Sequence, residues 1–289
     1  PAFHDAVSRN TNCSFEDDLP VQSRARQRYE KALENLKKNH LLPPATKRGE
    51  YILPYVYYVT YTDPSGEKRH MLLRLQDVDG ESCVNMEWQS KILPYDYFFL
   101  TISAEELLTG GYQYTKVADQ LITRLRVFRR SPEYHMVVII SKADLLFDKE
   151  NSYLEEAFEN SVTVQEDGRI YQTIHEEGFD YERFMHREEA VRTYLKDECP
   201  SFYNKLLNAV PERNITFCMT AAIGENGNSD SHFETYAPFC VDEPLCSVLA
   251  DAGMYPVAVY PEGPETEKVK GGFGDRVGSF WRIFKDKIK

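Results

Sequence analysis

Two short polar loops, each placed directly after an apolar run, carry the groups best suited to hold a ligand. One loop, at 141–144, follows the run at 135–140, and the other, at 220–222, follows the run at 214–219. Short β-branched and apolar runs are typical of buried parallel strands. Ligands of open α/β sheets bind outside the carboxyl ends of the strands, so both loops are expected at one edge of a sheet. The candidate binding residues are Ser141, Lys142, Asp144, Thr220, Ala221 and Ala222.

A third loop follows a predicted β-hairpin. Residues 55–62 alternate as a strand, Asp63-Pro64-Ser65-Gly66 is a turn signal, and residues 69–76 return as the second strand. The hairpin ends at Asp77, which begins an Asp-x-x-Gly sequence closed by Gly80.

Taken in chain order, the three loops resemble motifs of the P-loop GTPases: Asp-x-x-Gly, [NTS]-K-x-D and S/T-A-x. The resemblance implies that Asp144 accepts hydrogen bonds from guanine N1–H and the 2-amino group. It implies that the Lys142 stem lies along the base and that the Ala221 N–H meets guanine O6. It also implies that Asp77 holds Mg2+ through water, while the Gly80 N–H senses the γ-phosphate.

Within that superfamily, the chain is similar to the bacterial double-GTPase type, found in conflict and defence operons. The resemblance covers roughly residues 20–225 and rests on the segments at 42–46, 77–81 and 140–146. It implies that the Thr46 hydroxyl binds Mg2+, together with Asp77, although a simple strand-start threonine fits equally well. Glu81 stands where some GTPases place a glutamine that orients water. With Asp79 it adds negative charge beside the phosphates, which predicts slow hydrolysis or a weak or inactive site. The predicted catalytic groups are therefore Thr46, Gly80 and Glu81.

A phosphate-binding G-x-x-x-x-G-K-[ST] sequence does not occur in the 289 residues. In the GTPase fold that loop follows the central strand, and a sheet without this strand has two unpaired inner edges. The strand and loop are expected upstream of Pro1. A pseudo-GTPase without the loop is the competing explanation. A third explanation is a permuted fold, with 256–260 as the central strand and 270–274 as the phosphate loop. The sheet should be open between the strand ending at Asp77 and the strand at 96–103, and these residues alone should bind no nucleotide.

The predicted fold class is α/β, with a mostly parallel sheet, an antiparallel hairpin and a GTPase-like three-layer arrangement. A GTPase-like domain is expected over 1–225, with an insertion at about 147–211 packed at the sheet edge, and 226–289 as a C-terminal extension packed on the domain. Residues 1–20 are polar and predict no regular element. Further elements are predicted as helices at 21–40, 113–130, 181–208 and 245–252, a strand at 256–260, and an amphipathic helix near 277–288.

Composition limits the class of partner. The net charge of −12 disfavours nucleic acids and anionic membranes, which reward basic surfaces. Membrane contact is expected at most through the C-terminal amphipathic helix. The six cysteines form no C-x-x-C and suit reduced thiols in a cytoplasmic protein. The chain is thus predicted to be a cytoplasmic GTP-binding switch or slow GTPase that uses GTP and Mg2+, acts through a protein partner and serves in bacterial defence. The alternative is an inactive pseudo-GTPase that serves as an interaction module.

Overall fold

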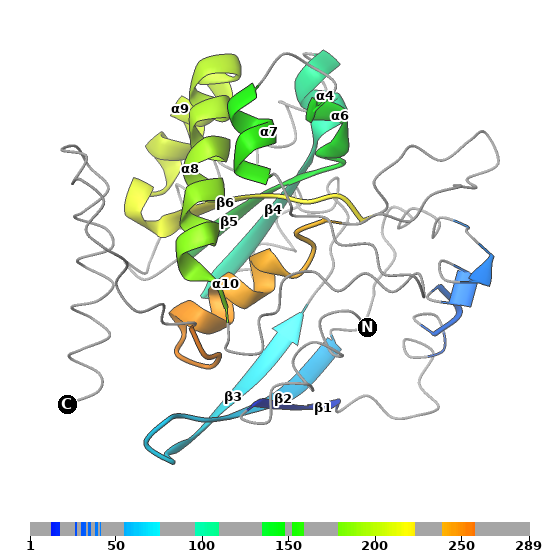
Figure 1. Ribbon diagram of the computed structural model, residues 1–289, viewed down its shortest axis with the longest axis vertical. Coiled ribbons are helices and arrows are strands. Elements are labelled where there is room, and N and C mark those ends of the chain that lie inside the picture. The colour runs from blue at the N-terminus through cyan, green and yellow to red at the C-terminus, as the bar shows by residue number, and fades with distance from the viewer. Residues whose placement is uncertain are drawn as a thin grey trace, which may run out of the picture. The chain divides into compact units, whose positions relative to one another are not determined.

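The computed structural model describes a large part of the chain: residues 13–17, 55–75, 96–109, 135–147, 152–158, 179–222 and 239–257, with single positions between 27 and 41 (Figure 1). The chain divides into two compact units, residues 1–258 and 259–289, and every described residue lies in the first unit. The described positions from 27 to 38 are helical, as predicted for 21–40. The helices predicted at 113–130 and near 277–288 lie outside the described residues.

The predicted hairpin is confirmed. Strands β2 (Tyr55–Thr62) and β3 (Lys68–Leu75) pair antiparallel in continuous register. Between them the Gly66 N–H donates to the Asp63 carbonyl at 2.9 Å, and Gly66 has a φ of 87°, which glycine adopts without strain. The Asp63 carboxylate accepts two further backbone N–H groups of the turn. Local sequence therefore sets the register of the hairpin.

A strand near the start of the chain was not predicted. Residues Cys13–Asp17 form β1, which pairs antiparallel with β2. The expectation of no regular element in 1–20 was wrong because strand pairing is non-local: the partner of β1 lies far along the chain. The Cys13 side chain is buried, and its thiol donates to the Met254 carbonyl at 3.7 Å.

The predicted parallel sheet is confirmed by three strands: β4 (Tyr97–Ser103), β5 (His135–Ser141) and β6 (Ile215–Met219). Their order is β4-β5-β6, and both pairings are parallel. The runs at 135–140 and 214–219 are therefore adjacent strands, and their carboxyl ends lie at the same edge of the sheet.

The described strands form two separate three-stranded sheets, β1-β2-β3 and β4-β5-β6. Strands β3 and β4 do not pair with each other in the described part of the chain, and residues 76–95, which include Asp77, lie outside it. The candidate strand 256–260 does not join them in the residues that can be described: Val257 makes a parallel bridge to Phe179 instead. This pairing counts against the permuted arrangement.

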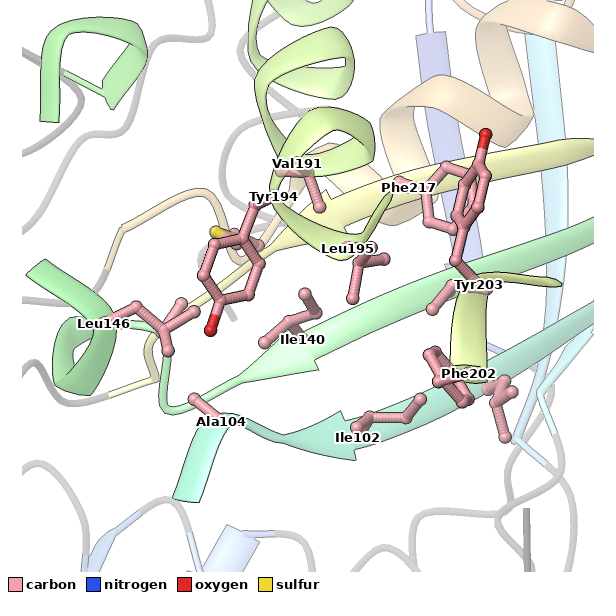
Figure 2. Packing of buried hydrophobic residues seen from close by; sticks show 14 of the residues in the cluster. Ile102, Ala104, Ile140, Leu146, Val191, Tyr194, Leu195, Phe202, Tyr203 and Phe217 are labelled. Atoms are coloured by element: carbon pink, nitrogen blue, oxygen red, sulfur yellow. The ribbon is translucent and has the colours of Figure 1, made fainter. Parts of the chain in front are cut away.

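Helices of the predicted insertion pack on the parallel sheet. They are α7 (Ser152–Phe158), α8 (Tyr181–Glu198) and α9 (Pro200–Ala209). The helix predicted over 181–208 is two helices, because Pro200 has no N–H to continue α8 and begins α9 instead. Figure 2 shows Val191, Tyr194 and Leu195 on the side of α8 that faces the parallel sheet, with Leu195 nearest to Ile140 of β5.

Side chains of the parallel sheet alternate between two apolar clusters, as expected for a sheet buried on both faces. On β5, Met136, Val138 and Ile140 belong to the cluster that includes α7, α8 and α9. Val137 and Ile139 belong to a second cluster, which includes helix α10 (Glu243–Asp251) and residues of the hairpin. Helix α10 confirms the helix predicted at 245–252, and its buried residues join the core of the first unit.

Candidate functional site

The two predicted binding loops lie side by side at the carboxyl ends of β5 and β6. The Thr220 N–H donates to the Ile140 carbonyl at 2.8 Å, which extends the pairing of β6 with β5. One step further, the Ala143 N–H donates to the Thr220 carbonyl at 3.1 Å. Backbone hydrogen bonds thus tie the 141–144 loop directly to the 220–222 loop, so groups on both loops can face a common ligand.

The 141–144 loop has a strained backbone at Lys142, whose φ is 52°. The left-handed region costs a non-glycine residue on the order of 1–3 kcal/mol, and such strain concentrates at functional sites. The Ser141 hydroxyl donates to the Ile102 carbonyl of β4 at 3.2 Å, which fixes the loop to the sheet. The Leu145 N–H donates a hydrogen bond to the Lys142 carbonyl at 3.1 Å, which closes a tight turn.

The Lys142 ammonium group forms an ion pair in the structure. Its Nζ lies 2.9 Å from Glu105 Oε2, a residue of helix α4 (Ala104–Thr109) directly after β4. Both side chains are more than half exposed, so water screens the pair and it contributes little to stability. The pair links the end of β4 to the ends of β5 and β6, so all three strand ends contribute to one site. A ligand can displace Glu105 from Lys142 at low cost in free energy.

Asp144 is the first residue of the short helix α6 (Asp144–Phe147). Its side chain is partly buried, whereas Leu146, two residues later, is fully buried in the cluster under α8. The Leu146 N–H donates to the Ala143 carbonyl at 2.9 Å. The core therefore anchors the loop through Leu146 and leaves the Asp144 carboxylate near the surface.

The 220–222 loop is more buried than the first loop. Ala221 is buried and exchanges two backbone hydrogen bonds with Phe239: its N–H donates to the Phe239 carbonyl at 3.1 Å, and the return bond is 2.9 Å. The Ala221 N–H, which the resemblance assigned to guanine O6, thus already has an acceptor. Ala222 follows it and is exposed.

The Phe239 ring also packs on the helix that follows the first loop, a contact that the sequence did not predict. Its ring centroid lies 5.5 Å from that of Phe147, at the end of α6, and 6.1 Å from that of Phe158 in α7. Phe239 is 4% exposed. The only sequence signal was the pair of adjacent apolar residues Phe239 and Cys240, which precede the helix predicted at 245–252 and could have indicated a buried segment.

Beyond Phe239 the chain enters a buried polar cluster. Arg187 of α8 forms an ion pair with Glu243, the first residue of α10, and both are almost fully buried. Burial raises the pKa of Glu243 to about 7, although the Arg187 charge opposes the shift. Burial likewise raises the pKa of Asp242 to about 6. The signal in the sequence was an arginine at helical spacing from the apolar Phe184 and Val191.

A further polar group at this edge is Ser103, the last residue of β4 and the register partner of Ser141. Its hydroxyl is buried and has no hydrogen-bond partner among the described residues.

The other predicted site residues, Thr46, Asp77, Gly80 and Glu81, lie outside the described residues, as does Asp79. Where the structure describes the chain, no cluster of three His, Cys, Asp or Glu side chains could hold a metal ion.

The comparisons with protein-family models, with curated proteins and with solved structures found no match to this chain. The described helices include none that is long and apolar enough to cross a membrane. The geometry of the two loops is therefore the basis for assigning a function.

Proposed function

We propose that the protein is a GTP-binding switch or slow GTPase, and that the described part of the chain forms its guanine-binding half. The observation that carries the proposal is the hydrogen bond from the Ala143 N–H to the Thr220 carbonyl. It joins a Ser-Lys-Ala-Asp loop to a Thr-Ala-Ala loop at the ends of adjacent parallel strands. This edge is where open α/β sheets bind nucleotides.

The residues of the two loops suit a guanine base. The Asp144 carboxylate accepts hydrogen bonds from N1–H and the 2-amino group, and a charged acceptor makes such bonds stronger than neutral ones. The apolar stem of Lys142 covers one face of the ring, because Lys side chains bury their methylenes while the ammonium stays in water. Release of Glu105 from Lys142 frees the charge for the nucleotide.

The donor for guanine O6 is the amide of Ala222 in this proposal. Successive amides along an extended chain point to opposite sides. The Thr220 N–H points toward β5 and the Ala221 N–H points toward Phe239. The next amide, that of Ala222, returns to the β5 side, where the 141–144 loop lies. Ala221 then has a structural role, and Ala222 has the binding role.

The phosphate side of the site requires a strand and an amide-rich loop between β3 and β4. The two described sheets end at these strands, which supports the GTPase-like three-layer arrangement with this strand at its centre. Thr46 and Asp77 would hold Mg2+, which neutralises charge on the β- and γ-phosphates. We further propose, on the family resemblance, that the protein is cytoplasmic and passes its nucleotide state to a protein partner in bacterial defence.

The test is titration of a fluorescent GTP analogue into protein expressed from its complete reading frame. The unmutated protein should prefer GTP over ATP. Asp144→Asn should weaken GTP binding by roughly 1.5–3 kcal/mol, because a hydrogen bond to a charged group is lost, and should relax discrimination against xanthosine triphosphate. Asp197→Asn, an equal change of charge at an exposed position on α8, is the matched control and should bind like the unmutated protein. Equal binding of ATP and GTP would refute guanine specificity.

A second function, an interaction module with a pseudo-GTPase fold, is favoured by two contacts. Lys142 is paired with Glu105, and the Ala221 N–H is paired with Phe239, so two groups of the site are satisfied within the chain. For such a module, the same titration should show no saturable binding of any nucleotide with or without Mg2+. A switch should lose affinity when Mg2+ is chelated, because the ion bridges the phosphates.

A further inference from the structure

Phe239 contacts the two binding regions through separate groups. Its backbone pairs with Ala221 of the 220–222 loop, and its ring packs on Phe147 of helix α6, which begins at Asp144, the last residue of the 141–144 loop. The inference drawn from this placement rests on the proposed function for its effect on nucleotide binding. Its effect on the loops themselves is independent of any ligand.

The backbone contact is a two-way exchange with the 220–222 loop. The Ala221 N–H donates to the Phe239 carbonyl and the Phe239 N–H donates to the Ala221 carbonyl. An isolated antiparallel bridge of this kind holds Ala221 extended at the point where β6 ends. It therefore sets which amides of the loop face β5 and which face away.

The ring contact is with the helix of the first loop. Phe239, Phe147 and Phe158 pack as a three-membered aromatic cluster with centroid separations of 5.5–6.1 Å. Aromatic pairs at this separation stabilise a structure beyond the burial of their surface. Phe147 is the last residue of α6 and Asp144 is the first, so a single helical turn joins the residue that contacts the Phe239 ring to Asp144.

The segment that presents Phe239 is itself held firmly. Cys240, the next residue, is 2% exposed and has a φ of 50°, a strained conformation for a non-glycine residue. Three residues later Glu243 forms its ion pair with Arg187, and its helix α10 packs into the core. Strain persists only where the surroundings enforce it, and these contacts enforce the position of Phe239.

We propose that Phe239 is a positioning residue that clamps the 141–144 and 220–222 loops into one fixed arrangement. Its carbonyl accepts the hydrogen bond of the Ala221 amide, which leaves the Ala222 amide to donate to the base. Its ring sets the position of Asp144 through helix α6. The clamp determines the specificity for guanine as well as the affinity, because it fixes the distance between an acceptor on one loop and a donor on the other.

The experiment compares Phe239→Leu with Phe184→Leu in the full protein. Phe184 is a matched control, since it is 3% exposed and packs in a three-membered aromatic cluster of its own with Phe179 and Tyr181, away from the loops. The measurement is hydrogen exchange of the Ala143 and Ala221 amides, at urea concentrations that give both variants the same global stability. Phe239→Met, which keeps most of the side-chain volume, tests for rescue.

The expected result is that both amides exchange about tenfold faster in Phe239→Leu than in Phe184→Leu, because local opening is easier without the clamp. Phe239→Met should restore most of the protection. In nucleotide titrations, Phe239→Leu should lose about tenfold in the ratio of GTP to ATP affinity, which is about 1.4 kcal/mol, and Phe184→Leu should keep the ratio.

If each amide exchanges at the same rate in Phe239→Leu as in Phe184→Leu, the clamp is overturned and Phe239 is an ordinary core residue. An unchanged GTP to ATP ratio in Phe239→Leu would overturn its role in specificity. If the unmutated protein binds no guanine nucleotide, the proposed function fails, whereas the exchange comparison still decides whether Phe239 couples the loops.

Discussion

Arg187 and Arg192 lie on the same helix, α8, and both guanidinium groups are buried, yet their surroundings differ. Arg192 pairs with Glu188 and with Glu212, at 3.0 Å for the second, and its guanidinium lies 4.8 Å from the centroid of the Phe217 ring. Arg187 has one ion-pair partner, Glu243. In the described part of the chain, two of its nitrogens, Nε and Nη1, lack a hydrogen-bond partner, compared with Nε alone for Arg192.

The difference separates an ion-pair network with a structural role, around Arg192, from a single ion pair that we expect to depend on pH, that of Arg187. Arg192 joins α8 to Glu212, which lies in the turn between α9 and β6, and Tyr203 of α9 also donates to Glu212. Arg187 holds the start of α10, next to the Cys240 strain and the Phe239 clamp. A buried charge with several partners resists change, whereas one with a single partner and a second carboxyl nearby responds to pH.

The largest effect is expected for Arg192→Leu. The change leaves Glu188 buried without its counter-charge, and breaking a buried ion pair in this way costs about 3–5 kcal/mol of unfolding free energy. Urea denaturation followed by circular dichroism measures the loss. Glu189→Gln is the control, because Glu189 is exposed and lies 3.8 Å from Arg192; its loss should be under about 0.5 kcal/mol.

A smaller and pH-dependent loss is expected for Arg187→Leu. At pH 8 the change leaves Glu243 and Asp242 buried without a counter-charge. Because these carboxyls can take up protons instead of staying charged, the loss should be smaller than the roughly 3–5 kcal/mol of a broken buried ion pair. At pH 5 both carboxyls are protonated in the folded state, so the cost should fall by about half. Denaturation at the two pH values checks this. A loss that is the same at pH 5 and pH 8 would place Arg187 in the same class as Arg192.

The unmutated protein should itself lose stability as the pH rises. The pKa of Glu243 rises from 4.5 when unfolded to about 7 when folded, so the folded state binds more protons between these values. Stability from this group is therefore complete below pH 4.5 and is lost as the pH passes 7. We expect a decrease on the order of 2 kcal/mol between pH 5 and pH 8. Glu243→Gln, which keeps an acceptor for Arg187 but cannot ionise, should reduce the slope.

The smallest effect is expected for Tyr203→Phe. The hydroxyl donates to Glu212 at 3.3 Å, and Glu212 is about half exposed, so water can replace the bond. The loss should be about 0.5–1 kcal/mol, the net contribution of one ordinary hydrogen bond. Denaturation at pH 7 measures it, and a loss above that of Arg187→Leu would reverse the ranking of the Arg192 network and the Arg187 ion pair.

Much of the fold could be predicted because its signals are local. The hairpin turn at Asp63–Gly66, the apolar runs of β5 and β6 and the polar loops after them are each readable within ten residues. The break at Pro200 was missed because helical spacing continues across it from α8 into α9. Strand β1 was missed because nothing near Cys13 indicates that its partner is β2.

The candidate site was predicted to the extent that it follows from strand ends. Ser141, Lys142, Asp144 and the 220–222 loop are brought together because β5 and β6 are adjacent and parallel. Their contacts with Glu105 and Phe239 depend on which other elements reach the same edge, and this follows from tertiary packing. Sequence patterns give the ends of strands but not the groups that arrive there from elsewhere.

The hydrogen bond from the Cys13 thiol to the Met254 carbonyl has a consequence for how the protein folds as it is synthesised. It joins two residues 241 positions apart, so β1 and the segment after α10 meet only once nearly the whole first unit has left the ribosome. Contacts of such sequence separation form late and slowly, since the chain must close a long loop first. Until then we expect the apolar side chains that Cys13 and Val59 contribute to the second apolar cluster to stay exposed to solvent, which makes an incomplete chain prone to aggregation.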